Sequence, residues 1–217
     1  MLDQVAVRHR VVFDLDGTLV DSVPGLAASA NQMLAEIGRD PVTATDYAAF
    51  CGWGMRQQIK QCLIATGGVP EDGLKPYLAR MMEIYSADPV HGSVRFEGVT
   101  DAINQLAARG YGLAVCTQKP EAQARQLLEA LGLMPPITGL TGGGTLDVLK
   151  PDPAMLFHAA DQIGTGPIVY VGDSTVDEKT AENAGVPFLF FEGGYRNGDV
   201  TAETRFADWS QLPSLIP

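Results

Sequence analysis

The sequence predicts an α/β protein with a doubly wound parallel sheet and an inserted all-helical domain. After residue 95, short apolar runs alternate with amphipathic segments, which is the pattern of parallel strands joined by helices. Between residues 22 and 91 the apolar positions keep a helical period, and no strand is predicted. One apolar run, residues 11–13, precedes this block. We therefore expect residues 1–20 and 92–217 to form the α/β core and residues 21–91 to form the helical domain.

The first predicted strand, Val11–Phe13, stops at two acidic residues. It is followed directly by Asp14-Leu15-Asp16-Gly17. Alternation along an extended chain places Asp14 and Asp16 on one side, where they can share a cation and a substrate. In open α/β sheets, ligands bind at the carboxyl ends of the strands. A calcium-binding EF-hand is excluded because no further oxygen ligands follow at the required spacing.

Four helices are predicted in the inserted block. Ser22 caps the first, which carries Pro24 in its first turn and ends at Gly38. Thr43 and Asp46 form a capping arrangement for the second. The third and fourth are marked by apolar residues at helical spacing, which are Met55, Ile59, Cys62 and Leu63 in the third and Leu74, Tyr77, Leu78, Met81, Met82 and Tyr85 in the fourth.

The second half of the chain alternates between strands and helices. The predicted strands span residues 113–116, 137–140, 168–171 and 188–191. The predicted helices run from a Thr100 cap to Gly110, from Pro120 to Gly132, from Pro153 to Ile163 and from about residue 178 to Gly185. The three glycines at 142–144 are predicted to form a flexible loop beside Lys150.

The composition excludes several classes of partner. The formal charge of the 217-residue chain is −11, which argues against nucleic acid or an anionic membrane, because both are bound by clustered lysine and arginine residues. No apolar run is long enough to cross a bilayer or to act as a signal peptide. The three cysteines are odd in number and widely separated, which indicates reduced thiols. We expect a cytoplasmic protein without a membrane partner, either a monomer or a homodimer.

A polar residue lies near the end of each of three further strands. Thr117 follows residues 113–116, Lys150 precedes the helix that starts at Pro153, and Asp173 follows residues 168–171 with Asp177 four positions later. Each alone has an ordinary structural explanation, since Thr and Asp-Ser cap helices and a lysine before proline is usually solvated. Together, at one edge of a parallel sheet, they indicate a site that handles phosphate.

The order of these groups resembles the haloacid dehalogenase-like hydrolase superfamily. The resemblance rests on four motifs and covers nearly the whole chain: Asp14-Leu15-Asp16-Gly17-Thr18, Thr117, Lys150-Pro151-Asp152-Pro153 and Gly172-Asp173-Ser174-Thr175-Val176-Asp177. Residues 14–22 and 150–153 are most similar to the phosphoglycolate phosphatase branch. The resemblance implies a Rossmann-like core, and it implies that the helical block is the superfamily's small helical cap.

The resemblance also implies roles for the acidic residues. Asp14 would be the nucleophile that forms an aspartyl-phosphate, and Asp16 would be the general acid and base. Mg²⁺ would be held by Asp14, the backbone carbonyl of Asp16 and Asp173. Asp177, one helical turn after Asp173, would hold a metal-bound water or orient Lys150.

The same resemblance predicts how phosphate is bound. Lys150 would supply positive charge as a catalytic residue, while the Thr117 hydroxyl and turn amides near Gly17 and Gln118 would donate to the phosphoryl oxygens. The predicted function is a magnesium-dependent phosphatase acting on a small phosphorylated metabolite, with phosphoglycolate as one candidate.

Three residues are predicted to select the substrate. Trp53 and Arg56 lie in a loop of the helical block whose composition is not that of a core, and Arg56 could meet a second anionic group of the substrate. Lys119 follows the second motif and is a similar candidate. Gln118 stands where the branch often has Asn, and Thr175-Val176 stands where Arg-Asn is frequent. These departures leave a sugar phosphate, a nucleotide and pyrophosphate open as substrates beside phosphoglycolate.

Alternatives on the same scaffold stay open. A sugar phosphomutase ranks second among enzymes, because the sequence carries no specific signature of one. A non-catalytic phospho-acceptor module, similar to a signalling receiver domain, also pairs a strand-end Asp with Thr and Lys, although receivers lack a large helical insert. Asp16 argues against a dehalogenase. Lys60 and Lys75 carry no sign of the desolvation that a phosphonate-cleaving enzyme would need.

Overall fold

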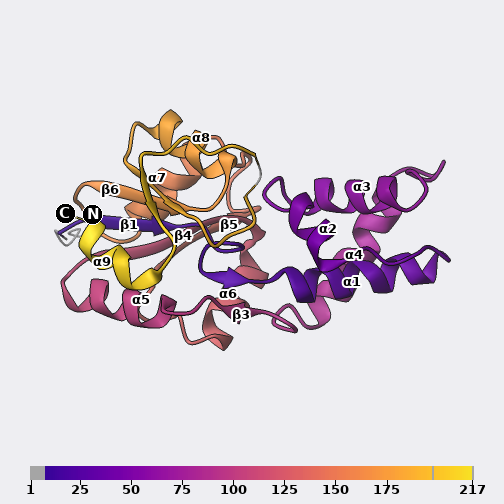
Figure 1. The fold of residues 1–217 in the computed structure, drawn as a ribbon, viewed down its shortest axis with the longest axis horizontal. Coiled ribbons are helices and arrows are strands. Elements are labelled where there is room, and N and C mark those ends of the chain that lie inside the picture. The colour runs from indigo at the N-terminus through magenta and orange to yellow at the C-terminus, as the bar shows by residue number, and fades with distance from the viewer. Residues whose placement is uncertain (1–7, 197, 217) are drawn as a thin grey trace.

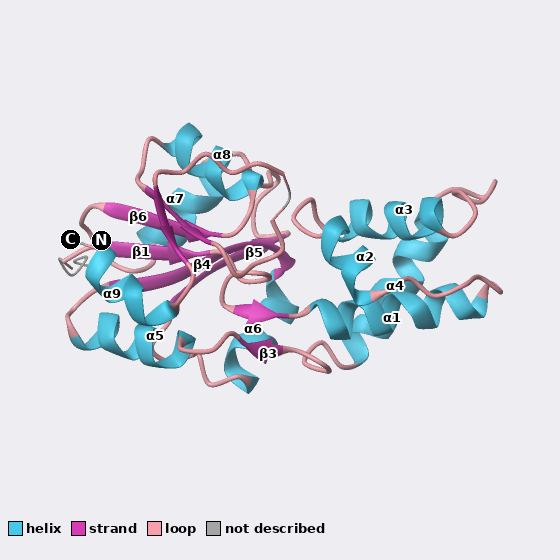
Figure 2. Ribbon diagram, in the orientation of Figure 1, coloured by secondary structure: helices cyan, strands magenta, loops and turns pink. Residues whose placement is uncertain are grey.

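The computed structural model describes residues 8–196 and 198–216, which contain a six-stranded sheet. Its strands are β1 (Arg10–Phe13), β4 (Gly112–Pro120), β5 (Gly139–Gly143), β6 (Ile168–Gly172), β7 (Phe188–Phe191) and β8 (Thr204–Phe206). They are arranged in the order β5-β4-β1-β6-β7-β8, and each neighbouring pair is parallel (Figure 1, Figure 2). The chain builds the sheet first on the β4 side of β1 and then on the β6 side. This confirms the doubly wound fold and places a crevice at the carboxyl end of β1.

Helices cover both faces of the sheet because its strands are apolar on both sides. Along β4, Leu113 and Val115 belong to one hydrophobic core, while Ala114 and Cys116 belong to the other. The first core also contains residues of α5 (Val99–Ala108), α6 (Glu121–Ala130), the 3₁₀ turn η1 (Trp209–Gln211) and α9 (Leu212–Leu215). The second contains residues of α7 (Ala154–Asp161) and α8 (Thr175–Ala184). Strands buried on both faces are typical of parallel sheets.

A bundle of four helices lies beside the sheet. It consists of α1 (Val23–Glu36), α2 (Ala44–Phe50), α3 (Met55–Ala65) and α4 (Lys75–Ala87). Figure 1 shows the bundle on one side of the molecule, with the sheet between it and the chain ends. The bundle has its own core, in which Met33, Tyr47, Ile59 and Tyr85 are fully or almost fully buried.

The two connections between sheet and bundle are joined by a short antiparallel pair. Residues of β2 (Val20–Asp21) pair with those of β3 (Val94–Arg95). The sequence did not predict these strands, because two residues are too few to show an apolar period. The pairing holds the exit from the core and the return to it side by side.

Several element boundaries differ from the sequence prediction. Gly98, in a left-handed conformation, caps α5 in place of Thr100, and Ser22 stands at the amino end of α1 without a side-chain capping bond. The predicted Thr43–Asp46 capping box is confirmed. Gly142 belongs to β5 and not to a flexible loop, because β5 packs so closely on α6 that a Cβ there would lie 2.5 Å from Glu121 Cα. The short β8 was also not predicted.

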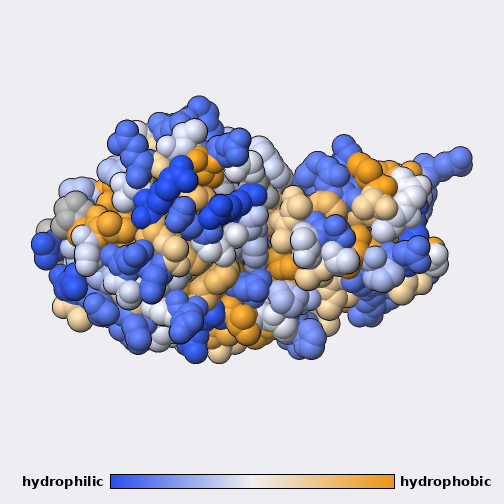
Figure 3. Space-filling model, viewed as in Figure 1, coloured by the Kyte–Doolittle hydropathy of each residue, from blue (hydrophilic) through white to orange (hydrophobic). Residues whose placement is uncertain are grey.

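The face of the molecule drawn in Figure 3 is mostly hydrophilic. Figure 3 shows blue residues over most of the sheet-bearing part, with smaller orange patches on both parts of the molecule. Scattered apolar residues on a protein surface are ordinary. Within the described part of the chain, every helix is too short or too polar to cross a lipid bilayer.

Candidate active site

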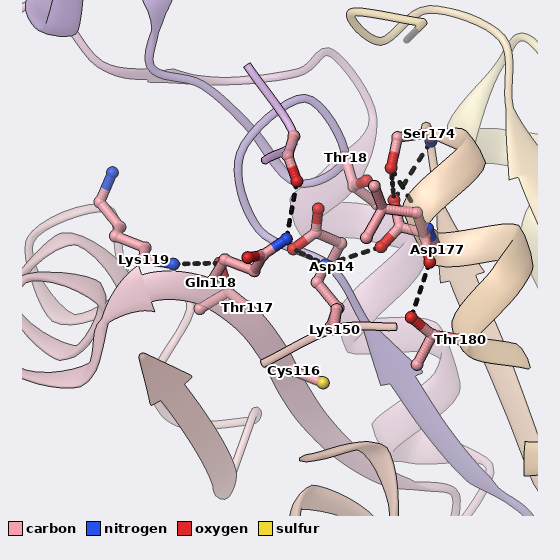
Figure 4. A network of polar contacts seen from close by, with 12 residues as sticks. Asp14, Thr18, Cys116, Thr117, Gln118, Lys119, Lys150, Ser174, Asp177 and Thr180 are labelled. Atoms are coloured by element: carbon pink, nitrogen blue, oxygen red, sulfur yellow. Dashed lines mark hydrogen bonds and ion pairs between the residues drawn. The ribbon is translucent and has the colours of Figure 1, made fainter. Parts of the chain in front are cut away.

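The carboxyl ends of four strands bring the predicted polar residues together. Asp14 directly follows β1, Asp173 directly follows β6, and Lys150 lies in the loop after β5. Thr117 lies within β4, which runs on to Pro120 although its register with β5 shifts after Cys116. Figure 4 shows Asp14 and Lys150 between the Thr117 segment on one side and the start of α8 on the other. All of these side chains are buried.

Lys150 joins two of the aspartates. Its ammonium nitrogen lies 2.9 Å from Asp14 Oδ1 and 2.7 Å from Asp177 Oδ1, and it donates to the Tyr170 hydroxyl at 3.2 Å. Burial by itself lowers the pKa of this ammonium group, but Asp14 and Asp177 outweigh burial and hold the pKa above its usual value. Lys150 therefore brings a permanent positive charge to an otherwise acidic site.

Asp177 holds Lys150 in place. Its Oδ1 accepts from Lys150 Nζ and, at 2.8 Å, from the Tyr170 hydroxyl. Its Oδ2 accepts from the amide and the hydroxyl of Ser174, which closes the capping box at the start of α8. Both oxygens of Asp177 are therefore occupied, and its predicted role in orienting Lys150 fits these contacts and stays a prediction.

Three aspartates form a buried cluster, and the pKa values of two of them, Asp14 and Asp173, are raised. Carboxylate oxygens of Asp14, Asp173 and Asp177 lie within 4.8 Å of one another. Burial is the main cause that raises the pKa of Asp14 to about 7, partly offset by Lys150. Burial, with the charges of Asp177 and Asp14, raises the pKa of Asp173 well above its usual value. Ionised carboxylates this close and this buried require further positive charge.

The cluster fits a divalent cation. Asp14 Oδ1 makes the ion-pair contact with Lys150, but within the described residues it has no hydrogen bond of good geometry. An under-satisfied carboxylate oxygen beside a second buried carboxylate is the donor set that Mg²⁺ prefers, since this ion binds one or two carboxylates and keeps several waters. A bound cation would also remove the cost of ionising Asp14 and Asp173 together.

Asp173 is held by three segments of the chain. Its Oδ1 accepts from the Thr18 hydroxyl at 2.7 Å, and its Oδ2 accepts from the Tyr195 amide at 2.8 Å. Glycine is needed at two neighbouring positions, because a Cβ on Gly17 would lie 2.4 Å from Asp173 Oδ2 and one on Gly194 would lie 2.3 Å from Asp173 Cβ. The Gly17 amide donates to the Val20 carbonyl, so this amide already has a partner within its own turn.

Asp16 is paired with a second buried lysine. Lys119 Nζ lies 2.9 Å from Asp16 Oδ1, which also accepts from the Ser22 hydroxyl at 2.5 Å. The ammonium group lies 4.9 Å from the ring centroid of Tyr85, a residue of α4. Burial acts to lower the pKa of Lys119, but Asp16 and Tyr85 hold it above its usual value. Each aspartate of the first motif is therefore matched by one buried lysine.

An open pocket lies between the sheet and the bundle, with about 470 Å³ of empty space that is partly open to solvent. The sheet side contributes Asp14, Asp16, Thr117, Gln118, Lys119, Pro120 and Lys150, and the bundle side contributes Leu26, Cys51, Gly52, Gly54, Met55 and Gln58. The Gln118 side chain bridges the two sides by donating to the Gly52 carbonyl at 2.7 Å.

The structure does not bring all the predicted specificity residues to the pocket. Trp53 is 55% exposed and lines a separate surface hollow with Phe50, and Arg56 is also exposed. Gly52, Gly54, Met55 and Gln58 line the pocket instead. A role for Trp53 and Arg56 in specificity stays a prediction, whereas Lys119 lines the pocket.

Sequence reasoning missed two tyrosines at the site, and it placed Thr18 in the first motif without predicting its contact with Asp173. Tyr170 binds Asp177, Tyr195 binds Asp173 through its amide, and the Thr18 hydroxyl binds the other oxygen of Asp173. Tyr170 carried a usable signal, because a tyrosine in a fully apolar strand needs a partner for its hydroxyl. Tyr195 carried none, since its partners are far away in the sequence.

Known proteins share this arrangement. The sequence profile of the haloacid dehalogenase-like hydrolases matches residues 11–191. A phosphoglycolate phosphatase of Cereibacter sphaeroides is 39% identical over 210 residues, which cover 95% of this chain and 96% of that protein. One of Rhodospirillum rubrum is 39% identical over 212 residues, covering 94% and 88%. The crystal structure of a predicted phosphoglycolate phosphatase from Haemophilus somnus superposes with a TM-score of 0.87 at 26% identity, covering 96% and 97%.

A doubly wound parallel sheet with buried aspartates and lysines at the carboxyl ends of its strands defines an α/β protein with one charged pocket at the sheet edge. With the profile match and the relatives, the chain belongs to the haloacid dehalogenase-like hydrolase family. Within that family it is a phosphatase, and its substrate is a phosphorylated small molecule.

Proposed function

We propose that this phosphatase hydrolyses a small phosphomonoester of the phosphoglycolate type through an aspartyl-phosphate on Asp14, with Mg²⁺ as its metal. The observation that carries the proposal is the placement of Asp14. Asp14 lines the pocket, its Oδ1 has no hydrogen bond of good geometry from the residues that the structure describes, and Lys150 Nζ lies 2.9 Å from it. Two relatives that are 39% identical to this chain bear the name phosphoglycolate phosphatase.

In the first step Asp14 attacks phosphorus and the bond from phosphorus to the leaving oxygen breaks. Asp16 donates a proton to that oxygen. In the second step Asp16 takes a proton from water, the water oxygen attacks phosphorus, and the bond to Asp14 breaks to release inorganic phosphate. Both carboxylates line the same pocket, which allows them to serve one substrate.

The cluster of Asp14 and Asp173 would hold the Mg²⁺ ion, with the backbone carbonyl of Asp16 as a further ligand. The ion would neutralise the phosphate and the acidic cluster. Lys150 would bind a phosphoryl oxygen from the other side, because Asp177 and Tyr170 fix its ammonium group. The Thr117 hydroxyl already accepts from the Lys119 amide at 3.1 Å and can still donate to phosphate.

Lys119 supports a substrate with a second anionic group. Its side chain is only 2% exposed, yet it lines the pocket and is fully charged beside Asp16. A substrate carboxylate can form a charge-assisted bond with this ammonium group, in exchange for its contact with Asp16. We further propose that residues 21–91 act as a cap domain that closes the pocket, since the bundle supplies Gly52, Met55 and Gln58 to its wall.

The test measures phosphate release from phosphoglycolate, a sugar phosphate, a nucleotide and pyrophosphate, with Mg²⁺ and with chelator. We expect release that needs Mg²⁺, that is fastest with phosphoglycolate and that is abolished in Asp14→Asn. No release from any substrate would contradict the proposed activity, and release unchanged in Asp14→Asn would contradict the proposed nucleophile.

Substrate choice is tested separately with Lys119→Met. This variant keeps the length of the side chain and removes its charge. We expect kcat/KM for phosphoglycolate to fall about tenfold or more relative to ethyl phosphate, which has a similar size and no carboxylate, because a charge-assisted bond is worth about 1.5–3 kcal/mol. Equal losses for the two substrates would refute carboxylate recognition by Lys119. The exposed Lys60 of α3 provides the matched control, Lys60→Met.

A further inference from the structure

Tyr195 connects the acidic cluster to the start of the helical bundle. It lies in the loop after β7, and its amide donates to Asp173 Oδ2 at 2.8 Å. Its hydroxyl accepts from the amides of Ser22 at 2.8 Å and Val23 at 3.2 Å, and it donates to Asp21 Oδ1 at 2.9 Å. One residue therefore makes contact with a candidate metal ligand and with the connection that leads out of the sheet.

The hydroxyl of Tyr195 takes the place of a helix cap. The first amides of a helix have no partner within the helix and require an acceptor from outside. At the start of α1 the usual acceptor would be the side chain of Ser22, but that hydroxyl donates to Asp16 instead. The Tyr195 hydroxyl and Asp21 Oδ1 accept from the Val23 amide in its place.

The position of the Tyr195 ring depends on the sheet side of the site. A Cβ on Gly17 would lie 2.8 Å from Tyr195 Cδ2 and 2.4 Å from Asp173 Oδ2. The Tyr195 ring and the Asp173 carboxylate therefore both pack closely against the turn at Gly17. The ring also packs against the core of the bundle. A shift of Asp173 would therefore be passed on to Tyr195, and from its hydroxyl to the amino end of α1.

We propose that Tyr195 is a positioning residue that couples cation binding at Asp173 to the orientation of the helical bundle. A cation at the acidic cluster fixes Asp173 and with it the Tyr195 amide, and the hydroxyl then holds the amino end of α1 in one orientation. The inference rests on the metal site of the proposed function. Such coupling is reciprocal, so a fixed bundle would in turn strengthen cation binding.

The test follows amide hydrogen exchange by NMR in the full chain, with chelator and with Mg²⁺ alone. In the unaltered protein we expect Mg²⁺ to strengthen this cap and to slow exchange at Ser22 and Val23 by about fivefold or more relative to amides of α3, a factor that corresponds to the typical worth of one helix cap. In Tyr195→Phe, which keeps the ring and the amide, we expect this relative slowing to disappear. Tyr77→Phe is the matched control, because among the described residues the Tyr77 hydroxyl donates to Asp72, which lies just before α4 and away from the start of α1.

Equal relative slowing in Tyr195→Phe and in the unaltered protein would overturn the coupling. The coupling would also be overturned if the unaltered protein showed no relative slowing of exchange although Mg²⁺ still raised its melting temperature. These outcomes are separate from the proposed function. Phosphate release without the exchange effect would refute the coupling alone, and the exchange effect without phosphate release would refute the proposed function alone.

Discussion

Replacing Lys150 with methionine tests how the site manages its charge. The side chain is 3% exposed and contacts Asp14 at 2.9 Å and Asp177 at 2.7 Å. Methionine has a similar length and carries no charge. We expect kcat/KM for phosphate release to fall about 150-fold, because a preorganised electrostatic partner of the transition state is worth about 3 kcal/mol.

The same change should shift the pH dependence. Lys150 lowers the pKa of Asp14, which burial raises to about 7. A nucleophile must be ionised, so activity is lost on the acid side as Asp14 takes up a proton. Without Lys150 the pKa of Asp14 rises further, and the acid limb of kcat/KM moves to higher pH. An acid limb that stays in place, or turnover within about threefold of the unaltered enzyme, would refute this reasoning.

A second variant separates stability from catalysis. Lys150→Met leaves Asp177 buried without its cation, which costs about 3–5 kcal/mol of unfolding free energy. Adding Asp177→Asn removes that unpaired charge, while the amide oxygen can still accept from Tyr170. We expect the double variant to regain much of the lost melting temperature and none of the activity. Activity is measured well below the melting temperatures of the single and the double variant. Lys60→Met serves as the control for removing an exposed lysine.

Three further predictions concern the surroundings of the cluster. In chelator, the unfolding free energy should fall as pH rises from about 4 to about 7, because the raised pKa values of Asp14 and Asp173 make the folded state bind more protons than the unfolded state. Thermal melts across this pH range check the prediction, and Asp14→Asn should flatten the dependence on pH. Tyr170→Phe should lower kcat/KM about fivefold through loss of a hydrogen bond to Asp177, and unchanged kinetics would contradict that role. Gly194→Ala should weaken Mg²⁺ binding, measured by calorimetry, because the Cβ of the new alanine would lie 2.3 Å from Asp173 Cβ. An affinity equal to that of the unaltered protein would contradict this prediction and show that the loop at residue 194 moves without displacing the Asp173 carboxylate.

Local patterns in the sequence were sufficient to predict the sheet, the four-helix insertion and the residues that face the pocket from the strand ends. Buried strands are short apolar runs, helices repeat at 3.6 residues, and parallel strands send their carboxyl ends to one edge. For this reason the strand order alone predicts that Asp14, Thr117, Lys150 and Asp173 lie together, and the fold does bring them to one site. The short strands β2, β3 and β8 escaped prediction because two or three residues carry no period.

Tertiary packing decided which side chains pair within that site. Lys119 and Asp16 are 103 positions apart, and Tyr195 and Asp21 are 174 positions apart, so no local pattern could link them. Their contacts depend on how the bundle sits against the sheet, which is set by the total packing of both cores. Exposure of Trp53 and Arg56 was decided in the same way, because the turn at Gly52 and Gly54 presents its backbone to the pocket and leaves Trp53 outside. The sequence by itself determined which chemical groups gather at the sheet edge, and the packing of the bundle on the sheet determined which of them hold one another.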